Sequence, residues 1–170
     1  MGKITRIFSA LFVIAICVAP IFNSCSSNGC MDNQSSIPLA GFYSSQTKGA
    51  ITVDSLTLYG VGAPGDSVLY SNQSLKQAYM PLRITTDETQ YVFHYEQKKL
   101  SSTALNDTLT IEYKKTPFFV SSECGTVYIF DIEDFAYTKH LIDSIKIPTM
   151  KITNADVETV KVYFRTANNS

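Results

Sequence analysis

The sequence has 170 residues, with 15 acidic and 14 basic side chains and a formal net charge of −1 at pH 7. This length suffices for one domain with a hydrophobic core. Adjacent basic residues occur only at Lys98-Lys99 and Lys114-Lys115. The near-neutral charge therefore excludes a nucleic-acid-binding protein that relies on a dense basic surface.

The N-terminal segment has the features of a secretory signal peptide. Lys3 and Arg6 precede an apolar run over residues 7–22, which contains Pro20 near its end. This run is shorter than the roughly 20 apolar residues of a membrane-spanning helix. A short positive region, a short apolar centre and small residues after it are typical of signal peptides. We expect residues 1–24 to be such a peptide, with a retained transmembrane anchor as the alternative.

Residues 22–25, FNSC, resemble a lipobox, the sequence at which bacteria attach diacylglycerol to a cysteine. Ser24 is small, as the position before the modified cysteine requires, whereas Phe22 and Asn23 depart from the usual leucine and small residue. We expect Cys25 to be the lipidated first residue of the mature protein, which makes membrane lipid its first partner. Ordinary cleavage after residues 24–26, SCS, is the alternative.

The four cysteines favour one disulfide. Loss of Cys17 with the signal peptide and lipidation of Cys25 would leave Cys30 and Cys124, an even number in an oxidising compartment. We predict a disulfide between Cys30 and Cys124. The alternatives are two free thiols, or a pairing of Cys25 with Cys30 in a chain without lipid.

Residues 25–37 are small and polar, and we expect them to form a tether between the lipid and a single domain over residues 38–170. Within this domain apolar residues alternate with polar ones, which indicates half-buried β-strands. The expected strands cover residues 50–59, 67–71, 77–84, 90–96, 107–113, 117–121, 126–132, 143–152 and 159–165. About eight or nine short strands joined by turns predict an all-β fold, namely an antiparallel, immunoglobulin-like β-sandwich.

Three local features refine this prediction. In residues 50–60 the alternation slips by one position, which predicts a β-bulge near Asp54-Ser55 or a break between two strands. Pro81 predicts an edge strand or another bulge, because proline has no amide hydrogen for the ladder. A helical turn or two is expected only over residues 132–141.

No motif in the sequence predicts an enzyme, a metal site or a cofactor. Residues 60–65, GVGAPG, fit the dinucleotide-binding fingerprint, but a strand rather than the required helix is expected after them. His94 and His140 are too few for a three-histidine zinc site, and the acidic residues within 131–134 lack the spacing of a calcium loop. We therefore expect no catalytic residues, no cofactor and no bound metal.

Tyrosines are frequent in this sequence, and tryptophan is absent. Tyrosine suits half-buried strands, so the core and its rim are the favoured location for these side chains. The alternative is an aromatic platform that binds sugar rings. The tyrosines considered are Tyr59, Tyr70, Tyr79, Tyr91, Tyr95, Tyr113, Tyr128 and Tyr163.

Four triplets share the pattern Asp, hydroxyl residue, aliphatic residue. This pattern resembles the O-glycosylation acceptor of certain Gram-negative anaerobes. It is equally typical of turns that lead into strands, because Asp, Ser and Thr favour turns and an aliphatic residue suits a strand. The hydroxyl residues of the triplets are Ser55, Ser67, Thr108 and Ser144.

Together with Cys30, the segments DSLTLYGVG, YMPLR, DTLTIEYKK and FFVSSECG resemble a family of small envelope lipoproteins of Gram-negative anaerobes, which is catalogued only as a domain of unknown function. The ECG at residues 123–125 and the N-terminal cysteine are the most specific marks. The resemblance covers nearly the whole mature chain and implies an exported lipoprotein with a β-sandwich fold. It carries no known catalytic residue.

These observations predict a non-enzymatic outer-membrane lipoprotein that is an accessory or assembly partner of another envelope protein, such as an outer-membrane β-barrel. Surface-exposed lipoproteins of related lineages resemble one another in carrying acidic residues just after the lipidated cysteine. Here residues 26–29 are SSNG, so we expect the protein to face the periplasm. The alternative function is a surface glycan- or host-binding module built on the tyrosine-rich strands, and a hydrolase is the third.

Overall fold

The computed structural model describes residues 36–62, 67–122 and 125–166. These residues form ten β-strands and the short 3-10 helix η2 (Thr103–Leu105). Among them, no helix has the length and apolar character needed to span a bilayer. The strands are β1 (Leu39–Ser44), β2 (Val53–Gly60), β3 (Val68–Leu75), β4 (Gln77–Tyr79), β5 (Glu88–Tyr95), β6 (Asp107–Ser121), β7 (Gly125–Tyr137), β8 (Ile142–Lys146), β9 (Lys151–Ile152) and β10 (Glu158–Phe164).

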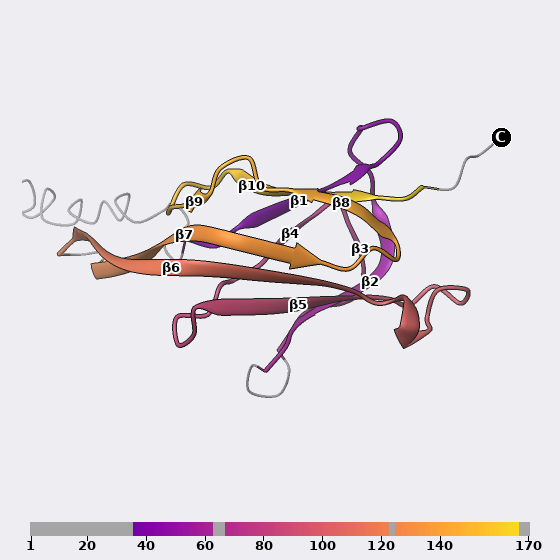
Figure 1. Cartoon of the computed structure of the whole chain (residues 1–170), viewed down its shortest axis with the longest axis horizontal. Coiled ribbons are helices and arrows are strands. Elements are labelled where there is room, and N and C mark those ends of the chain that lie inside the picture. The colour runs from indigo at the N-terminus through magenta and orange to yellow at the C-terminus, as the bar shows by residue number, and fades with distance from the viewer. Residues whose placement is uncertain (1–35, 63–66, 123–124, 167–170) are drawn as a thin grey trace, which may run out of the picture. The chain divides into compact units, whose positions relative to one another are not determined.

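The strands form two sheets that pack against each other (Figure 1). The four-stranded sheet has the order β4-β1-β10-β8, and the six-stranded sheet has the order β3-β2-β5-β6-β7-β9. The prediction of an all-β sandwich is confirmed. It needs one correction, because β1 and β10 pair in parallel, whereas the other strand pairs are antiparallel. The strand orders also differ from the seven-stranded scheme of a constant-type immunoglobulin domain.

Strands β6 and β7 form a long hairpin, and two further predictions for this part of the chain are wrong. Two segments predicted as separate strands form the single strand β6, and residues 132–141, predicted as a helical turn, include the end of β7. The register shifts where Tyr113 pairs with Ile132, which leaves Glu133 as an extra residue in β7. This bulge interrupts the period-two pattern, so the segment does not look like a strand in the sequence.

The predicted irregularity in β2 is a bulge. Ser55 has a φ of 53°, and the pairing of β2 with β3 shifts between Val53 and Leu56. The bulge places Leu56 and Leu58 on the core face, where both are fully buried. Pro81 lies just beyond β4, which is an edge strand of the four-stranded sheet. This location removes the need for an amide hydrogen at Pro81.

The core lies between the two sheets and is rich in aromatic rings. Phe42 of β1 and Phe164 of β10 make an edge-to-face contact with a centroid distance of 5.4 Å. Phe93 of β5 lies 6.4 Å from each of these rings, across the sandwich. Edge-to-face pairs contribute free energy beyond that of area burial. These three rings therefore hold the two sheets together.

Two buried tyrosines fasten the connection between β4 and β5. The hydroxyl of Tyr91 lies 2.9 Å from the carbonyl oxygen of Met80 and 2.7 Å from that of Pro81. The hydroxyl of Tyr113 donates to the carbonyl oxygen of Arg83 (2.7 Å). Both rings are about 1% exposed. A buried hydroxyl needs a hydrogen-bond partner. Here the partners are carbonyl oxygens of the β4–β5 connection, so these hydrogen bonds attach that connection to the six-stranded sheet.

Raising the pH above 10 is expected to unfold the domain. Burial raises the pKa of Tyr91 and of Tyr95 well above the usual value of 10. A hydrogen bond to Glu158, followed by burial, raises the pKa of Tyr43 to about 12. Tyrosines of an unfolded chain ionise near pH 10. The stability that these neutral hydroxyls provide is therefore complete below pH 10 and is lost as the pH rises to 12 and beyond.

Far-UV circular dichroism during an alkaline titration measures this effect. The strand signal should fall cooperatively above pH 10, and the absorbance of tyrosinate should rise in the same transition, because Tyr91 and Tyr95 ionise only when the fold opens. A strand signal that stays unchanged up to pH 12 would contradict the prediction.

The sandwich has two different ends. At one end β1 and β10 begin, β4 ends beside β1, and the β6–β7 hairpin turns (Figure 1). We name it the tether end, because the predicted tether immediately precedes β1 in the sequence. At the opposite end β1 and β10 finish and the chain proceeds toward its C-terminus.

Candidate functional site

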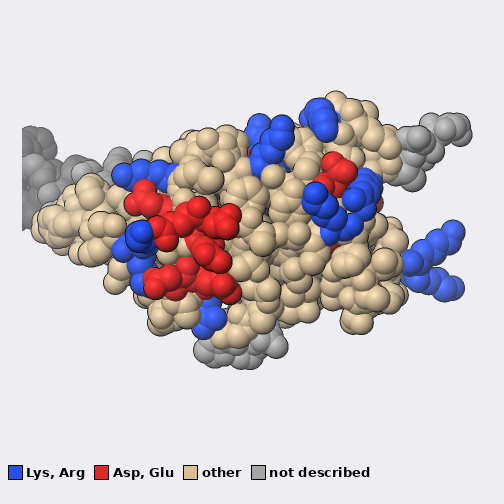
Figure 2. Space-filling view, viewed as in Figure 1, with Lys and Arg blue, Asp and Glu red and all other residues tan. Residues whose placement is uncertain are grey.

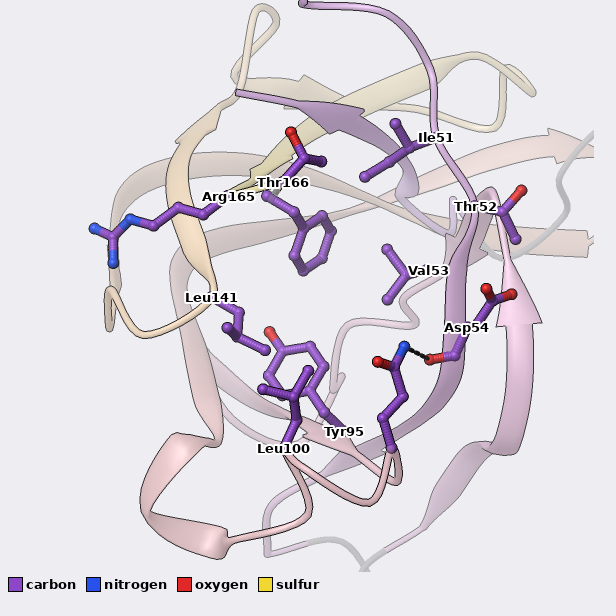
Figure 3. Close-up of a pocket in the computed structure, with 11 residues that line it drawn as sticks. Ile51, Thr52, Val53, Asp54, Tyr95, Leu100, Leu141, Arg165 and Thr166 are labelled. Atoms are coloured by element: carbon purple, nitrogen blue, oxygen red, sulfur yellow. Dashed lines mark hydrogen bonds between the residues drawn. The ribbon is translucent and has the colours of Figure 1, made fainter. Parts of the chain in front are cut away.

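A cavity of about 450 Å³ opens at the end of the sandwich opposite to the tether end (Figure 3). We name this end the pocket end. The volume lies in the range of about 300 to 1,000 Å³ that is typical of small-ligand sites. It is the natural candidate for a binding site in the described part of the chain.

Apolar side chains from both sheets and from the adjoining loops form the interior of the cavity. Figure 3 shows Ile51 and Val53 on one side and Leu100 and Leu141 on the other. All four are half-buried and pack against the core, and Phe164, at the end of β10, also lines the cavity. Tyr95 and Phe164 belong to the core and also line the cavity, so the core continues into it. An apolar group of a ligand would extend the core.

Two polar side chains at the rim, those of Gln97 and Arg165, are held by other groups of the protein. Gln97 Nε2 donates to the carbonyl oxygen of Asp54 (3.1 Å), which is the hydrogen bond drawn in Figure 3. Arg165 donates to the backbone oxygens of residues 139–140 (2.9 and 2.7 Å), and its Nε lies 3.7 Å from Asp143 Oδ1. Figure 3 shows the Arg165 guanidinium pointing away from the cavity. The remaining lining is contributed mainly by apolar side chains.

A fully buried carboxylate, Asp107, supports the wall of the cavity. It accepts hydrogen bonds from the hydroxyl of Tyr95 (2.9 Å) and of Thr138 (3.0 Å). It also accepts from the backbone N–H groups of residues 140–142, at 2.7, 2.8 and 2.8 Å. Charge-assisted bonds of this kind are stronger than neutral ones. They fix Tyr95 and the loop that carries Leu141, two components of the cavity.

Both histidines contact polar groups of the protein. His94 Nδ1 lies 2.8 Å from Asn106 Oδ1, and its Nε2 lies 3.7 Å from Glu96. His140 Nδ1 lies 3.5 Å from Asp107 Oδ1. Within the described ranges, no three His, Cys, Asp or Glu side chains are grouped so that they could hold a metal ion.

Residues 60–65, which fit the dinucleotide fingerprint, do not precede a helix. Gly60 ends β2, and the next element is strand β3, which begins at Val68. Residues 63–66 lie outside the described residues. A phosphate site of this type needs the N-terminus of a helix after the glycines. Among the described residues, the element that follows the motif is a strand, as predicted.

The four triplet hydroxyl residues lie in different surroundings. Ser67 is exposed just before β3, whereas Ser55, Thr108 and Ser144 are half-buried within strands. None of them lines the cavity. The Asp of the third triplet is the buried Asp107, so this carboxylate has a structural role.

The three cysteines of the predicted mature chain, Cys25, Cys30 and Cys124, lie outside the described residues. The described neighbours of Cys124 belong to the β6–β7 hairpin, where Ser121 of β6 pairs with Gly125 of β7. This part of the hairpin is at the tether end, where β1 also begins (Figure 1).

The eight tyrosines considered in the sequence differ in burial. Tyr79 is exposed, at 38%, and its hydroxyl donates to Asp156 (2.9 Å). Tyr163 packs against Tyr43 with a centroid distance of 5.5 Å on the outer face of the four-stranded sheet. The other seven are buried or half-buried, namely Tyr59, Tyr70, Tyr91, Tyr95, Tyr113, Tyr128 and Tyr163.

Sequence reasoning missed Asp107 as an anchor and missed the loop residues of the cavity. Asp107 begins an alternating strand, but an Asp at that position is more often an exposed turn residue. Leu100 and Leu141 lie in loops without a periodic pattern, so no sequence signal brings them together.

The comparisons with known proteins give a family but no characterised relative. No curated protein and no solved structure matches the chain. The model of a family of unknown function, DUF6452, matches residues 55–164, from the bulge in β2 to the end of β10. This match covers more than half of the chain and confirms the predicted resemblance to a domain of unknown function. The chain belongs to the DUF6452 family.

Proposed function

We propose that this protein is a non-enzymatic outer-membrane lipoprotein that faces the periplasm and is an accessory partner of another envelope protein. The apolar cavity at the pocket end is the observation that carries this proposal. An apolar side chain or short segment of the partner would enter the cavity and continue the core. Burial of one large apolar side chain contributes about 1.5–3 kcal/mol, which suits a reversible contact within a larger interface.

An anchor at Cys25 would leave the cavity accessible. Residues 26–38 separate Cys25 from the start of β1, which lies at the tether end. The cavity lies at the opposite end of the sandwich. A partner can therefore reach the cavity while the lipid remains in the membrane.

The contacts around the cavity support binding rather than catalysis. Gln97 and Arg165 are bound to backbone oxygens, and Asp107 is enclosed by five hydrogen-bond donors. The alternative of a glycan- or host-binding module has less support. Seven of the eight tyrosines considered are buried or half-buried, so they do not present one exposed stacking surface.

Site-specific photocrosslinking in cells that express the full-length protein tests the proposed partner site. A photoreactive amino acid at Thr52, which is exposed beside the cavity, should give a discrete adduct with another envelope protein. Leu100→Asp should reduce this adduct about tenfold or more, because a carboxylate in an apolar site costs more than 1.4 kcal/mol, roughly the energy of a tenfold change in binding.

Ser74, an exposed position on β3, is the matched control for Thr52. Thermal unfolding of the Leu100→Asp protein verifies that it folds. Equal adducts from Thr52 and Ser74, or an adduct that is unaffected by Leu100→Asp in a folded protein, would contradict the proposed partner site.

A further inference from the structure

We infer that the protein associates with itself head to tail: the outer face of the four-stranded sheet of one molecule docks onto the outer face of the six-stranded sheet of a second copy. These two surfaces carry opposite charges. Neither includes a residue that lines the cavity. The inference therefore goes beyond the proposed function and depends neither on the cavity nor on the lipid anchor.

The first surface is a row of three carboxylates across the six-stranded sheet, which we name the acidic row. Glu112 of β6 lies directly opposite Glu88 of β5 on one side and Asp134 of β7 on the other. All three are exposed, and none is in an ion pair within the described residues. Like charges that lie directly opposite one another on adjacent strands destabilise a sheet. The isolated molecule therefore carries an electrostatic cost that a cationic surface would relieve.

The lysines closest to the acidic row in the sequence are paired with other carboxylates. Lys114 forms an ion pair with Glu133, and Lys115 forms one with Asp87. Figure 2 shows the resulting group of acidic side chains over β6 and β7. The acidic row is therefore not neutralised from within the described part of the chain.

The outer face of the four-stranded sheet has the opposite arrangement. Lys161 of β10 lies directly opposite Lys146 of β8, which is a second like-charge pair, and Tyr163 lies directly opposite Tyr43 of β1. The ammonium groups of Lys48 and Lys146 lie 5.1 and 5.8 Å from the centroid of the Tyr163 ring. That of Lys161 lies 5.3 Å from the centroid of Tyr43. Cation–π contacts of this length hold the three ammonium groups over the rings. We name these five residues the basic face.

Glu158 lies beside the basic face, but the protein engages its carboxylate. The hydroxyl of Tyr43 lies 2.9 and 2.7 Å from the two carboxylate oxygens, and Lys161 Nζ lies 3.5 Å from one of them. A Cβ atom at Gly41 would lie 1.8 Å from Glu158 Oε2, so the glycine provides the space for this carboxylate against β1. The other two lysines of the basic face are in no ion pair within the described ranges. The face therefore keeps an excess of positive charge.

A second copy of this chain is the occupant that the charges favour. Docking of the basic face onto the acidic row brings three lysines to three carboxylates, and it relieves both like-charge arrangements at once. The two surfaces belong to the outer faces of different sheets, so one molecule can use both. Such a heterologous contact continues from copy to copy instead of closing as a twofold dimer. The two tyrosine rings add aromatic surface of the kind that protein interfaces favour.

Zero-length crosslinking of the purified full-length protein in a non-ionic detergent tests this contact directly. Unlabelled protein and protein labelled with heavy nitrogen are mixed and treated with a carbodiimide, which joins a lysine to a carboxylate only where the two touch. We expect bonds between the two isotopic forms that join Lys146 or Lys161 to the acidic row. They should form at about 0.01 M salt, where the Debye length is about 30 Å, and disappear at about 1 M, where it is about 3 Å. Bonds confined to one isotopic form, or bonds between copies that avoid both surfaces, would overturn the inference.

Charge reversal with analytical ultracentrifugation gives an independent test. The Lys146→Glu, Lys161→Glu protein and the Glu88→Lys, Glu112→Lys protein should each self-associate about tenfold more weakly than the wild type, or less, because like charges then face each other. An equal mixture of the two should associate again, since the first protein keeps the native acidic row and the second keeps the native basic face. A mixture that stays monomeric, with both proteins folded by thermal unfolding, would contradict a head-to-tail contact.

Lys98→Glu, Lys99→Glu is the matched control, because it makes the same change of charge at two exposed lysines outside both surfaces. It should self-associate like the wild type, and so should Leu100→Asp, which alters the cavity. Equal weakening by the control and by Lys146→Glu, Lys161→Glu would show that net charge alone governs association, and the basic face would be wrong. The response to Leu100→Asp separates failure of this contact from failure of the proposed partner site.

Discussion

Replacement of Asp107 by alanine is expected to lower the free energy of unfolding by about 4 kcal/mol or more. Asp107 is fully buried and accepts hydrogen bonds from two hydroxyls and three backbone N–H groups. A hydrogen bond to a charged group contributes about 1.5–3 kcal/mol, and buried donors left without a partner add a desolvation penalty. The contributions are not additive, but their loss together places this substitution among the most destabilising.

Urea unfolding of the wild-type and variant proteins measures this effect. Asp107→Asn keeps the shape of the side chain but replaces one acceptor oxygen with a donor, so it should cost about half as much as Asp107→Ala. Asp131→Ala is the matched control, because Asp131 is exposed on the same sheet and should change stability by no more than about 0.5 kcal/mol. A loss in free energy of unfolding below about 1.5 kcal/mol for Asp107→Ala would contradict this prediction. It would show that water accepts the hydrogen bonds in place of the carboxylate.

The Asp107 network also explains why the cavity was not predictable from sequence. The alternation that starts at Leu109 identifies strand β6, because period two reflects which face of one strand is buried. This alternation contains no information about the loop at residues 139–141, which donates backbone hydrogen bonds to the Asp107 carboxylate. The cavity depends on such long-range contacts, since Val53, Leu100 and Leu141 come from three distant parts of the chain.

Irregularities in strands were predictable when they shifted an otherwise clear pattern. The slip near Ser55 was visible because leucines continue the alternation after it, and the structure places a bulge there. The bulge at Glu133 was not visible, because acidic residues surround it and obscure the core-facing positions. The sequence of this segment therefore predicts a helical turn, although pairing with β6 makes it a strand.

Composition alone could not separate buried from exposed tyrosines. A tyrosine in a strand suits both the core and the surface, because its ring is apolar and its hydroxyl is polar. Tyr91 and Tyr113 are buried because carbonyl oxygens of the β4–β5 connection are in reach of their hydroxyls. Tyr79 has the same strand context in the sequence but lies on an edge strand, where it is exposed.

Loss of the proposed Cys30–Cys124 disulfide is the second large effect that we expect. Such a bond would close a loop of about 94 residues, and the chain-entropy model assigns it ~4–5 kcal/mol. The described residues beside Cys124 lie in the turn of the β6–β7 hairpin at the tether end, and β1, which follows Cys30 in the chain, starts at the same end. The bond would tie the predicted tether to the β6–β7 hairpin.

Urea unfolding of single and double variants, in a Cys25→Ala background, distinguishes a bridge from two free thiols. Cys30→Ser and Cys124→Ser should each lower the free energy of unfolding by about 4 kcal/mol, and the double variant should cost little more, because each change removes the same bond. A reducing agent should destabilise the parent protein by a similar amount and leave the variants unchanged. Two independent thiols would instead give additive losses and no response to reduction. A bridge also requires the two Cα atoms to lie within ~7 Å, so a larger separation in an experimental structure would rule it out.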